Sequence, residues 1–226
     1  MIFKQLFDTK SSTYTYIISS GQGREALIID PVIENVDDYL NILRILDLKL
    51  VKVIDTHIHA DHITGASKLK QATSCITLMG EHTPAETVEI KVKDEEIIKL
   101  DQLEIKALHT PGHTSDSFSF LMNNCLFSGD TLLINGTGRT DFQNGSAKDA
   151  YNSIFNRLLK LPEETILYPG HDYNGEKTST IGKEKKFNPR LQVDSVSEYE
   201  EIMNNLNLPK PKLMDINVPR NIKLGA

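Results

Sequence analysis

The sequence is poor in cysteine and contains no long hydrophobic run. Its 226 residues include only two cysteines, Cys75 and Cys125, and neither belongs to a closely spaced pair. The cysteines therefore predict neither a disulfide framework nor a thiolate zinc site. Both lie in apolar, β-like runs, so we expect buried structural thiols. No apolar stretch is long enough to cross a bilayer, and we expect no membrane binding.

Basic residues are not in excess either. The 25 lysines and arginines are outnumbered by 31 aspartates and glutamates, which gives a formal net charge of −6. The nearest approach to a basic cluster, KEKK at 183–186, fits an exposed helix face, whereas nucleic-acid-binding proteins usually carry a broad basic surface. The N-terminus lacks the charged and long apolar segments of a secretory signal. We therefore expect a cytoplasmic protein that does not bind nucleic acid.

The sequence does contain an alternation of short strands and amphipathic helices. Runs rich in β-branched and aromatic residues predict strands at 2–7, 13–19, 25–30, 50–55, 75–79, 96–100, 103–108, 117–122, 125–130 and 165–168. Helical spacing of apolar residues, with a Ser146-x-x-Asp149 start, predicts helices at 35–46, 62–72, 147–159 and 195–206. The pattern predicts an α/β (α+β, four-layer) fold of two packed sheets with helices outside. We expect one domain over residues 1–226, with a short helical C-terminal extension from about residue 178.

The most informative segment is DTHIHADHITG, residues 55–65, which follows the apolar run LVKVI. It holds three histidines and two aspartates in eleven positions. Polar groups at the end of a buried strand are costly to desolvate unless they are paired, and a metal ion is the obvious partner. Three more such residues follow strands or glycine turns later in the chain: His113, Asp130 and His171. Imidazole and carboxylate ligands without cysteine suit zinc, iron or manganese.

Two other histidines lie outside this pattern. His82 and His109 belong to no motif with a mechanism, so we interpret them as surface or hydrogen-bonded residues. The H-x-H-x-D-H motif at 57–62 has the opposite interpretation, because its spacing points several ligands at one place from a single turn.

Four motifs, THIHADH, HTPGHT, LFSGDT and YPGHDY in this order, resemble the metallo-β-lactamase superfamily. The resemblance implies an αββα sandwich with a metal site at one edge of the sheets. Because that superfamily contains hydrolases of several kinds and also iron-dependent oxygenases, the fold alone does not fix the reaction.

Three further stretches narrow the resemblance: INGTGRTDFQNGS at 134–146, KKFNPRL at 185–191 and NLNLPKPKLMDINVP at 205–219. They are similar to the persulfide dioxygenases, also called sulfur dioxygenases, of the ethylmalonic encephalopathy protein type. Glyoxalase II enzymes usually carry a Gly-Cys-Gly-Arg turn and a Phe-Glu-Gly in the first stretch, and both are missing here. The resemblance therefore implies an oxidoreductase that converts glutathione persulfide and O2 to sulfite and glutathione.

The resemblance also implies a ligand set. In persulfide dioxygenases two histidines and one aspartate hold a single Fe(II), and the matching residues here are His57, His113 and Asp130. A 2-His-1-carboxylate site leaves positions open for a substrate sulfur and for dioxygen. The other polar residues of the motifs would surround the metal and orient its ligands and waters; they are His59, Asp61, His62 and His171.

Those same four residues support an alternative. In the dinuclear hydrolases they form a second metal position, so a glyoxalase II-like hydroxyacylglutathione hydrolase with a dinuclear zinc or iron site is our second hypothesis. A third hypothesis is a non-catalytic metal-binding or redox-sensing module, for which two isolated cysteines offer little support.

The resemblance finally implies a substrate site and partners. Arg139, Tyr173 and Arg190 match positions that the family places around glutathione, whose carboxylates suit the planar fork of arginine. The alternative for Arg190 is a structural ion pair. From the family we also expect a homodimer and a functional link to a separate sulfurtransferase.

Overall fold

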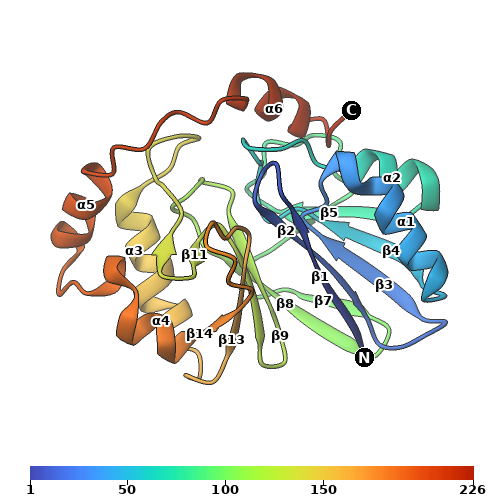
Figure 1. Ribbon diagram of the computed structural model, residues 1–226, viewed down its shortest axis with the longest axis horizontal. Helices are drawn as coiled ribbons and strands as arrows, with labels where there is room; N and C mark the ends of the chain where they lie inside the picture. Colours follow the sequence, from blue (N-terminus) through green and yellow to red (C-terminus); the bar gives the residue numbers. More distant parts are fainter.

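The computed structural model describes residues 1–226 as two six-stranded β-sheets packed face to face (Figure 1). The first sheet contains, in spatial order, β1 (Ile2–Asp8), β2 (Thr13–Ser19), β3 (Glu25–Ile29), β4 (Lys49–Ile54), β5 (Ile76–Gly80) and β6 (Ile90–Val92). The second contains β14 (Ser179–Thr180), β13 (Ile166–Pro169), β10 (Cys125–Gly129), β9 (Phe118–Met122), β8 (Leu103–His109) and β7 (Ile97–Leu100). A small hairpin joins β11 (Leu132–Leu133) and β12 (Gly136–Thr137).

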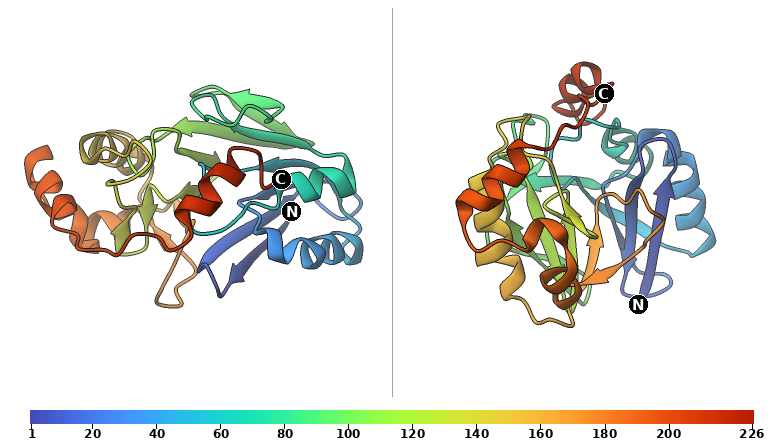
Figure 2. Two further views of the ribbon diagram at one scale, coloured as in Figure 1. Left: turned by 90° about the horizontal axis from the view of Figure 1, so that it is seen from above. Right: turned by 60° about the vertical axis from the view of Figure 1, so that its left-hand side comes forward.

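Helices cover the outer faces of both sheets (Figures 1 and 2). The first sheet is covered by α1 (Val36–Ile45), preceded by the 3-10 turn η1 (Ile33–Asn35), and by α2 (Ala66–Thr73). The second is covered by α3 (Ala147–Asn156), η2 (Leu158–Lys160), α4 (Ile181–Phe187), η3 (Pro189–Leu191) and α5 (Val196–Asn204). The last helix, α6 (Met214–Asn221), lies apart at the top of Figure 1.

Three hydrophobic clusters hold these layers together. One lies between the two sheets and includes Ile18 and Phe120, which are both fully buried. The others lie beneath the helices and include Tyr39 of α1 and Ile154 of α3. Burying one such side chain contributes about 1.5–3 kcal/mol relative to leaving it exposed. The predicted four-layer αββα arrangement is confirmed.

One predicted helix start is confirmed and another is wrong. Ser146 caps α3, since its hydroxyl accepts a hydrogen bond of 3.2 Å from the backbone N–H of Asp149. In contrast, α2 begins at Ala66 and not at His62. The backbone before α2 is bonded outside the helix, because the N–H of Gly65 donates to the carbonyl of Pro31 at 2.7 Å. Tertiary contacts therefore replace the first helical turn that the apolar spacing predicted.

Several short elements have no counterpart in the predictions, among them β6, the β11–β12 hairpin and β14. The predicted helix at 147–159 is also divided, because Arg157 leaves the helical region between α3 and η2. The proline-spaced tail contains α6, which accommodates Pro219 within the helix. The periodicity of apolar residues does not predict these elements, because their apolar runs are too short or contain proline.

The two cysteines are free. Cys75 is buried beneath the helices of the first sheet, as expected, whereas Cys125 at the start of β10 is only half-buried. Burial raises the pKa of both thiols. A raised pKa favours the unreactive protonated thiol, so a redox-sensing role gains no support.

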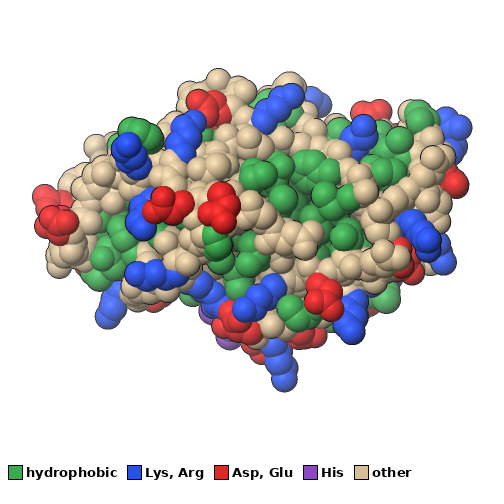
Figure 3. Space-filling model, turned by 90° about the horizontal axis from the view of Figure 1, so that it is seen from below, with side chains coloured by type: hydrophobic (Ala, Val, Ile, Leu, Met, Phe, Trp, Pro, Cys, Tyr) green, Lys and Arg blue, Asp and Glu red, His purple; other side chains and the backbone are tan.

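None of the helices combines the length and the hydrophobicity that a membrane-spanning helix needs. Figure 3 shows the side opposite α6, where hydrophobic side chains gather near the centre and most charged side chains lie around them. Large hydrophobic side chains are also exposed in the C-terminal tail, namely Leu208, Leu213 and Ile216. A contiguous exposed apolar area such as the one in Figure 3 is typical of contact sites.

Candidate metal centre

The predicted ligands meet at one edge of the sandwich. His57 follows β4, His113 follows β8, Asp130 follows β10 and His171 follows β13. The ligand atoms of His57, His113 and Asp130 all lie within 4.8 Å of one another. We call these three residues the triad. Strands from both sheets therefore deliver the triad, as the positions of the motifs after the strands predicted.

Hydrogen bonds fix the ring orientation of both triad histidines. The hydroxyl of Thr56 donates to the Asp30 carboxylate at 3.0 Å, so it must accept from Nδ1 of His57, which lies 3.0 Å away. The backbone carbonyl of Arg139 accepts from Nδ1 of His113 at 2.8 Å. The Nδ1 atom of each imidazole thus carries a proton, and in the neutral ring the Nε2 atom has a free electron pair that can bind a metal.

The electrostatics of the triad also suit a metal. Burial lowers the pKa of His57 well below its ordinary value, and the neighbouring rings of His59 and His113 lower it further. Neutral imidazole is the form that binds a metal. Oδ1 of Asp130 is buried and has no hydrogen-bond partner. A buried carboxylate oxygen without a partner is costly, and a divalent cation would satisfy it, so the donor set fits a metal ion.

A second group of possible ligands, His59, Asp61 and His62, lies beside the triad. Nδ1 of His62 is 2.8 Å from Oδ2 of Asp61, and the hydroxyl of Thr13 donates to the same oxygen at 3.0 Å. His171 connects the two groups, because its Nε2 lies 3.5 Å from Asp130 and 3.6 Å from Asp61. We call His59, Asp61 and His62 the second group.

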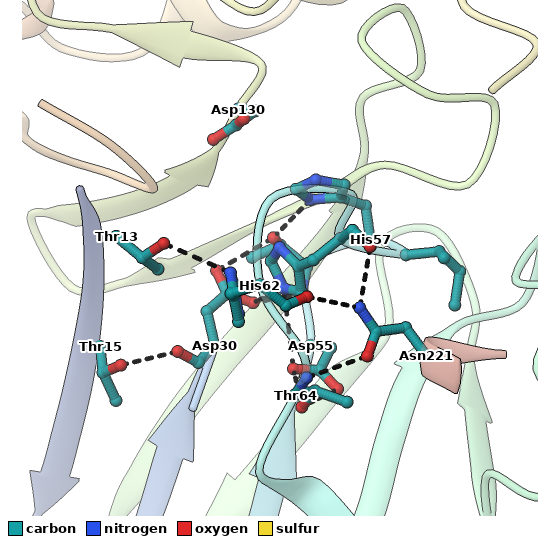
Figure 4. Close-up of polar contacts among 12 residues, drawn as sticks. Thr13, Thr15, Asp30, Asp55, His57, His62, Thr64, Asp130 and Asn221 are labelled. Atoms are coloured by element: carbon teal, nitrogen blue, oxygen red, sulfur yellow. Dashed lines mark hydrogen bonds and ion pairs between the residues drawn. The ribbon is translucent and has the colours of Figure 1, made fainter. Parts of the chain in front are cut away.

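Two carboxylates lie close to Nε2 of His59. Its Nε2 is 3.1 Å from Oδ1 of Asp30 and 3.7 Å from Oδ1 of Asp55, and Figure 4 labels both carboxylates. Burial alone would lower the pKa of His59, but these carboxylates outweigh it and raise the pKa well above the ordinary value. Nδ1 of His59 and Nε2 of His62 are buried and have no partner. The second group therefore keeps two nitrogen atoms that face no protein acceptor.

Sequence reasoning missed the residues that support the ligands. Asp30 and Asp55 directly follow the apolar runs of β3 and β4, and this placement was a usable signal. Thr13 and Asn221 had no such signal in the sequence, since each is an ordinary polar residue far from the motifs. Only the fold brings them to the histidine segment (Figure 4).

A cavity of about 590 Å³ opens onto the triad. Its lining includes His113, Asp130, His171 and all three predicted substrate residues. Two lysines that the sequence did not single out, Lys210 and Lys212, also line it. Cationic side chains therefore dominate the charged part of the wall away from the triad.

The three predicted substrate residues differ in their partners. The Nε and Nη2 atoms of Arg139 bond to Asp141 at 2.6 and 2.7 Å, so its fork is already occupied. Arg190 donates to the carbonyl of Thr137 and forms no ion pair with an acid, which leaves donors for a ligand. Tyr173 is exposed and stacks parallel to the ring of His171. The structural ion pair that we considered for Arg190 is thus absent.

His82 and His109 take no part in the site. Their rings stack on each other with centroids 4.2 Å apart, and Nε2 of His109 lies 3.3 Å from the carbonyl of Ser115. They are surface and hydrogen-bonded residues, as interpreted from the sequence.

Comparison with known proteins agrees with this geometry. Residues 8–171 match the model of the Metallo-beta-lactamase superfamily. The crystal structure of ETHE1 from Myxococcus xanthus superposes with a TM-score of 0.98 at 47% identity, and the match covers 100% of both chains. Persulfide dioxygenase ETHE1 from Mus musculus is 39% identical over 100% of this chain and 89% of its own length. Hydroxyacylglutathione hydrolase from Dictyostelium discoideum is 30% identical over 88% of this chain and 90% of its own. The chain therefore belongs to the metallo-beta-lactamase superfamily and, within it, to the persulfide dioxygenase family.

Proposed function

We propose that this persulfide dioxygenase oxidises glutathione persulfide with O2 to sulfite and glutathione, using a single Fe(II) held by His57, His113 and Asp130. The observation that carries the proposal is the triad itself, of which His113 and Asp130 line a cavity that cationic side chains also line. The balanced reaction consumes one persulfide, one O2 and one water, and it yields glutathione, sulfite and two protons. Both oxidation of the outer sulfur and release of the thiol are accounted for.

Two histidines and one carboxylate on one face suit a non-haem Fe(II). When bound, Fe(II) would supply the redox chemistry that joins oxygen to sulfur, which amino-acid side chains cannot supply. The chain's own part is to keep the ligands ready. Thr56 and the carbonyl of Arg139 hold the two triad imidazoles with Nε2 unprotonated.

The cavity wall is suited to the anionic tripeptide part of the substrate. Arg190 and Lys212 line the cavity without an acidic partner and offer cationic donors for its two carboxylates, whereas Lys210 is bonded to Asp215 at 2.8 Å. The Tyr173 hydroxyl is a further donor beside His171. Arg139 is bonded to Asp141, so we assign its main effect to holding the loop and not to a direct carboxylate contact.

A glyoxalase II-like hydrolase with two zinc ions is the second candidate. It is favoured by the unpartnered Nδ1 of His59 and Nε2 of His62, which keep a second metal position open. Similarity to the hydroxyacylglutathione hydrolase supports it less than the ETHE1 relatives support the dioxygenase, because identity is lower.

Several finer expectations accompany the proposal. We propose a cytoplasmic homodimer of single-domain chains, each with a C-terminal extension, that is functionally coupled to a separate sulfurtransferase. The exposed tail residues Leu208, Leu213 and Ile216 are available to a dimer contact.

Oxygen consumption tests the proposed reaction. Anaerobically iron-loaded protein should take up O2 when glutathione persulfide is added, and sulfite should appear in equal amount. The matched control is His113→Ala, which lacks one proposed ligand and should show neither. Iron-loaded protein that takes up no O2, while zinc-loaded protein hydrolyses S-lactoylglutathione, would replace the dioxygenase with the hydrolase.

A further inference from the structure

The C-terminal segment Leu208–Asn221 connects the two halves of the molecule. In Figure 1 the chain leaves α5 beside the second sheet and crosses the top of the molecule to α6, beside the first sheet. Val218 and Ile222, in and just after α6, pack against the cluster beneath α1 and α2. The segment thus has one attachment in each half of the molecule.

On the side of the first sheet, Asn221 holds the histidine segment. Its Nδ2 donates to the backbone carbonyls of His59 and His62, each at 2.8 Å (Figure 4). Its Oδ1 accepts from the backbone N–H of Thr64 at 2.9 Å. The side chain is 1% exposed, so these bonds do not compete with water.

A second asparagine of α6 extends the same contact. Nδ2 of Asn217 donates to the carbonyl of Ala60 at 3.0 Å, and this residue is also buried. Residues 55–63 form no helix or strand, so their backbone groups need partners from elsewhere. Helix α6 supplies partners for three carbonyls within four residues, those of His59, Ala60 and His62.

On the side of the second sheet, Arg139 holds the segment. Its Nη1 donates to the carbonyl of Pro209 at 2.8 Å, and its Nη2 donates to that of Leu208 at 3.3 Å. The backbone carbonyl of the same Arg139 orients the ring of His113. One attachment of the segment is therefore to the loop at 55–63, which carries His57, and the other is to Arg139, which orients His113.

We propose that Leu208–Asn221 is a clamp with two contacts near the triad. It holds the loop at 55–63, which carries His57, and it is bonded to Arg139, whose carbonyl orients His113. Asn221 is its positioning residue for the loop at 55–63. The inference rests on the proposed metal site. It goes beyond simple anchoring of a tail, because Lys210, Pro211 and Lys212 of the clamp also line the cavity. Substrate contacts and the order of the metal loop therefore depend on one segment.

Metal binding by Asn221→Ala tests the clamp without any substrate. The substitution removes three hydrogen bonds to the loop, and its matched control is Asn205→Ala, which loses only an exposed bond to the carbonyl of Glu201. We expect Asn221→Ala to bind Co(II) and anaerobic Fe(II) about tenfold or more weakly than the parent, with an altered Co(II) visible spectrum. Asn205→Ala should match the parent in both.

A purely structural role for Asn221 predicts another result. It would lower the melting temperature of metal-free protein but leave the Co(II) affinity and spectrum unchanged, and that result would overturn the clamp. Should Asn221→Ala not fold, Asn217→Ala decides, since it removes one bond and should weaken Co(II) binding by a smaller factor of about three or more. Unchanged affinity there would equally overturn the proposal. A parent that binds metal but oxidises no persulfide would refute the proposed function alone, because the affinity ratio needs no turnover.

Discussion

The triad and the second group contain the same kinds of residue but differ in how the protein has already bonded them. In the triad, Oδ1 of Asp130 has no protein partner. In the second group, Oδ2 of Asp61 accepts from Thr13 and lies 2.8 Å from Nδ1 of His62. The Asp130 carboxylate accepts no hydrogen bond from the protein, whereas a cation bound at Oδ2 of Asp61 would share that oxygen with Thr13 and His62. Residue type alone therefore does not decide how many metals bind.

The histidines differ in the same way. Those of the triad donate to neutral oxygens, the Thr56 hydroxyl and the Arg139 carbonyl. His59 of the second group faces two carboxylates, Asp30 and Asp55. The carboxylates raise the pKa of His59, so a metal at its Nδ1 competes with a proton, whereas burial lowers the pKa of His57. Both differences favour one metal at the triad.

The largest expected effect comes from removing the free carboxylate. Asp130→Ala should reduce Fe(II) affinity by more than about a hundredfold and abolish persulfide oxidation, because a site with three protein ligands loses one of them. Metal content after anaerobic loading and desalting measures this directly. A conservative substitution at exposed Asp149, Asp149→Asn, is the control and should retain its iron. Full iron content in Asp130→Ala would remove Asp130 from the ligand set.

A smaller effect is expected from the carboxylate of the second group. Asp61→Asn keeps the shape of the side chain and should leave one metal per chain, with kcat/KM reduced by no more than about tenfold. The reduction follows from weaker support of His62 and His171, which lie next to Asp61. Metal counting by mass spectrometry distinguishes the outcomes. A fall from two metals to one would instead identify the dinuclear site of a hydrolase.

The sequence was sufficient to predict the elements and ligands that depend on local pattern. The strand runs, the Ser146 cap and the delivery of several ligands to one edge needed only periodicity, turn chemistry and motif spacing, whereas the resemblance selected His57, His113 and Asp130 as the ligand set. Because β4 belongs to the first sheet and β8 and β10 to the second, the convergence of the triad also depends on how the two sheets pack. The resemblance to a family then supplied the reaction.

The supporting residues were beyond such reasoning for a physical reason. Asn221 reaches the carbonyl of His59 across 162 positions of sequence, and Thr13 reaches Asp61 across 48. Contacts at such separation depend on how the two sheets and α6 pack, which no local pattern records. The wrong start of α2 has the same origin, because the residues before Ala66 bond to Pro31 and Asn221 and not to their own helix.

The smallest and most selective effect is expected from Thr13. Thr13→Val keeps the β-branched shape in β2 but removes the hydroxyl that donates to Asp61 at 3.0 Å. A hydrogen bond to a charged group contributes about 1.5–3 kcal/mol, so a second cation that no longer competes with it should bind roughly tenfold more tightly. Zinc titration of the variant should show a second equivalent at concentrations where the parent binds one, while Thr15→Val, in the same strand but bonded to Asp30 and Tyr39, should not. Unchanged zinc stoichiometry in Thr13→Val would mean that the hydrogen bond to Asp61 does not lower the metal affinity of the second group. The carboxylates beside His59 would then account alone for the difference in metal affinity between the two groups.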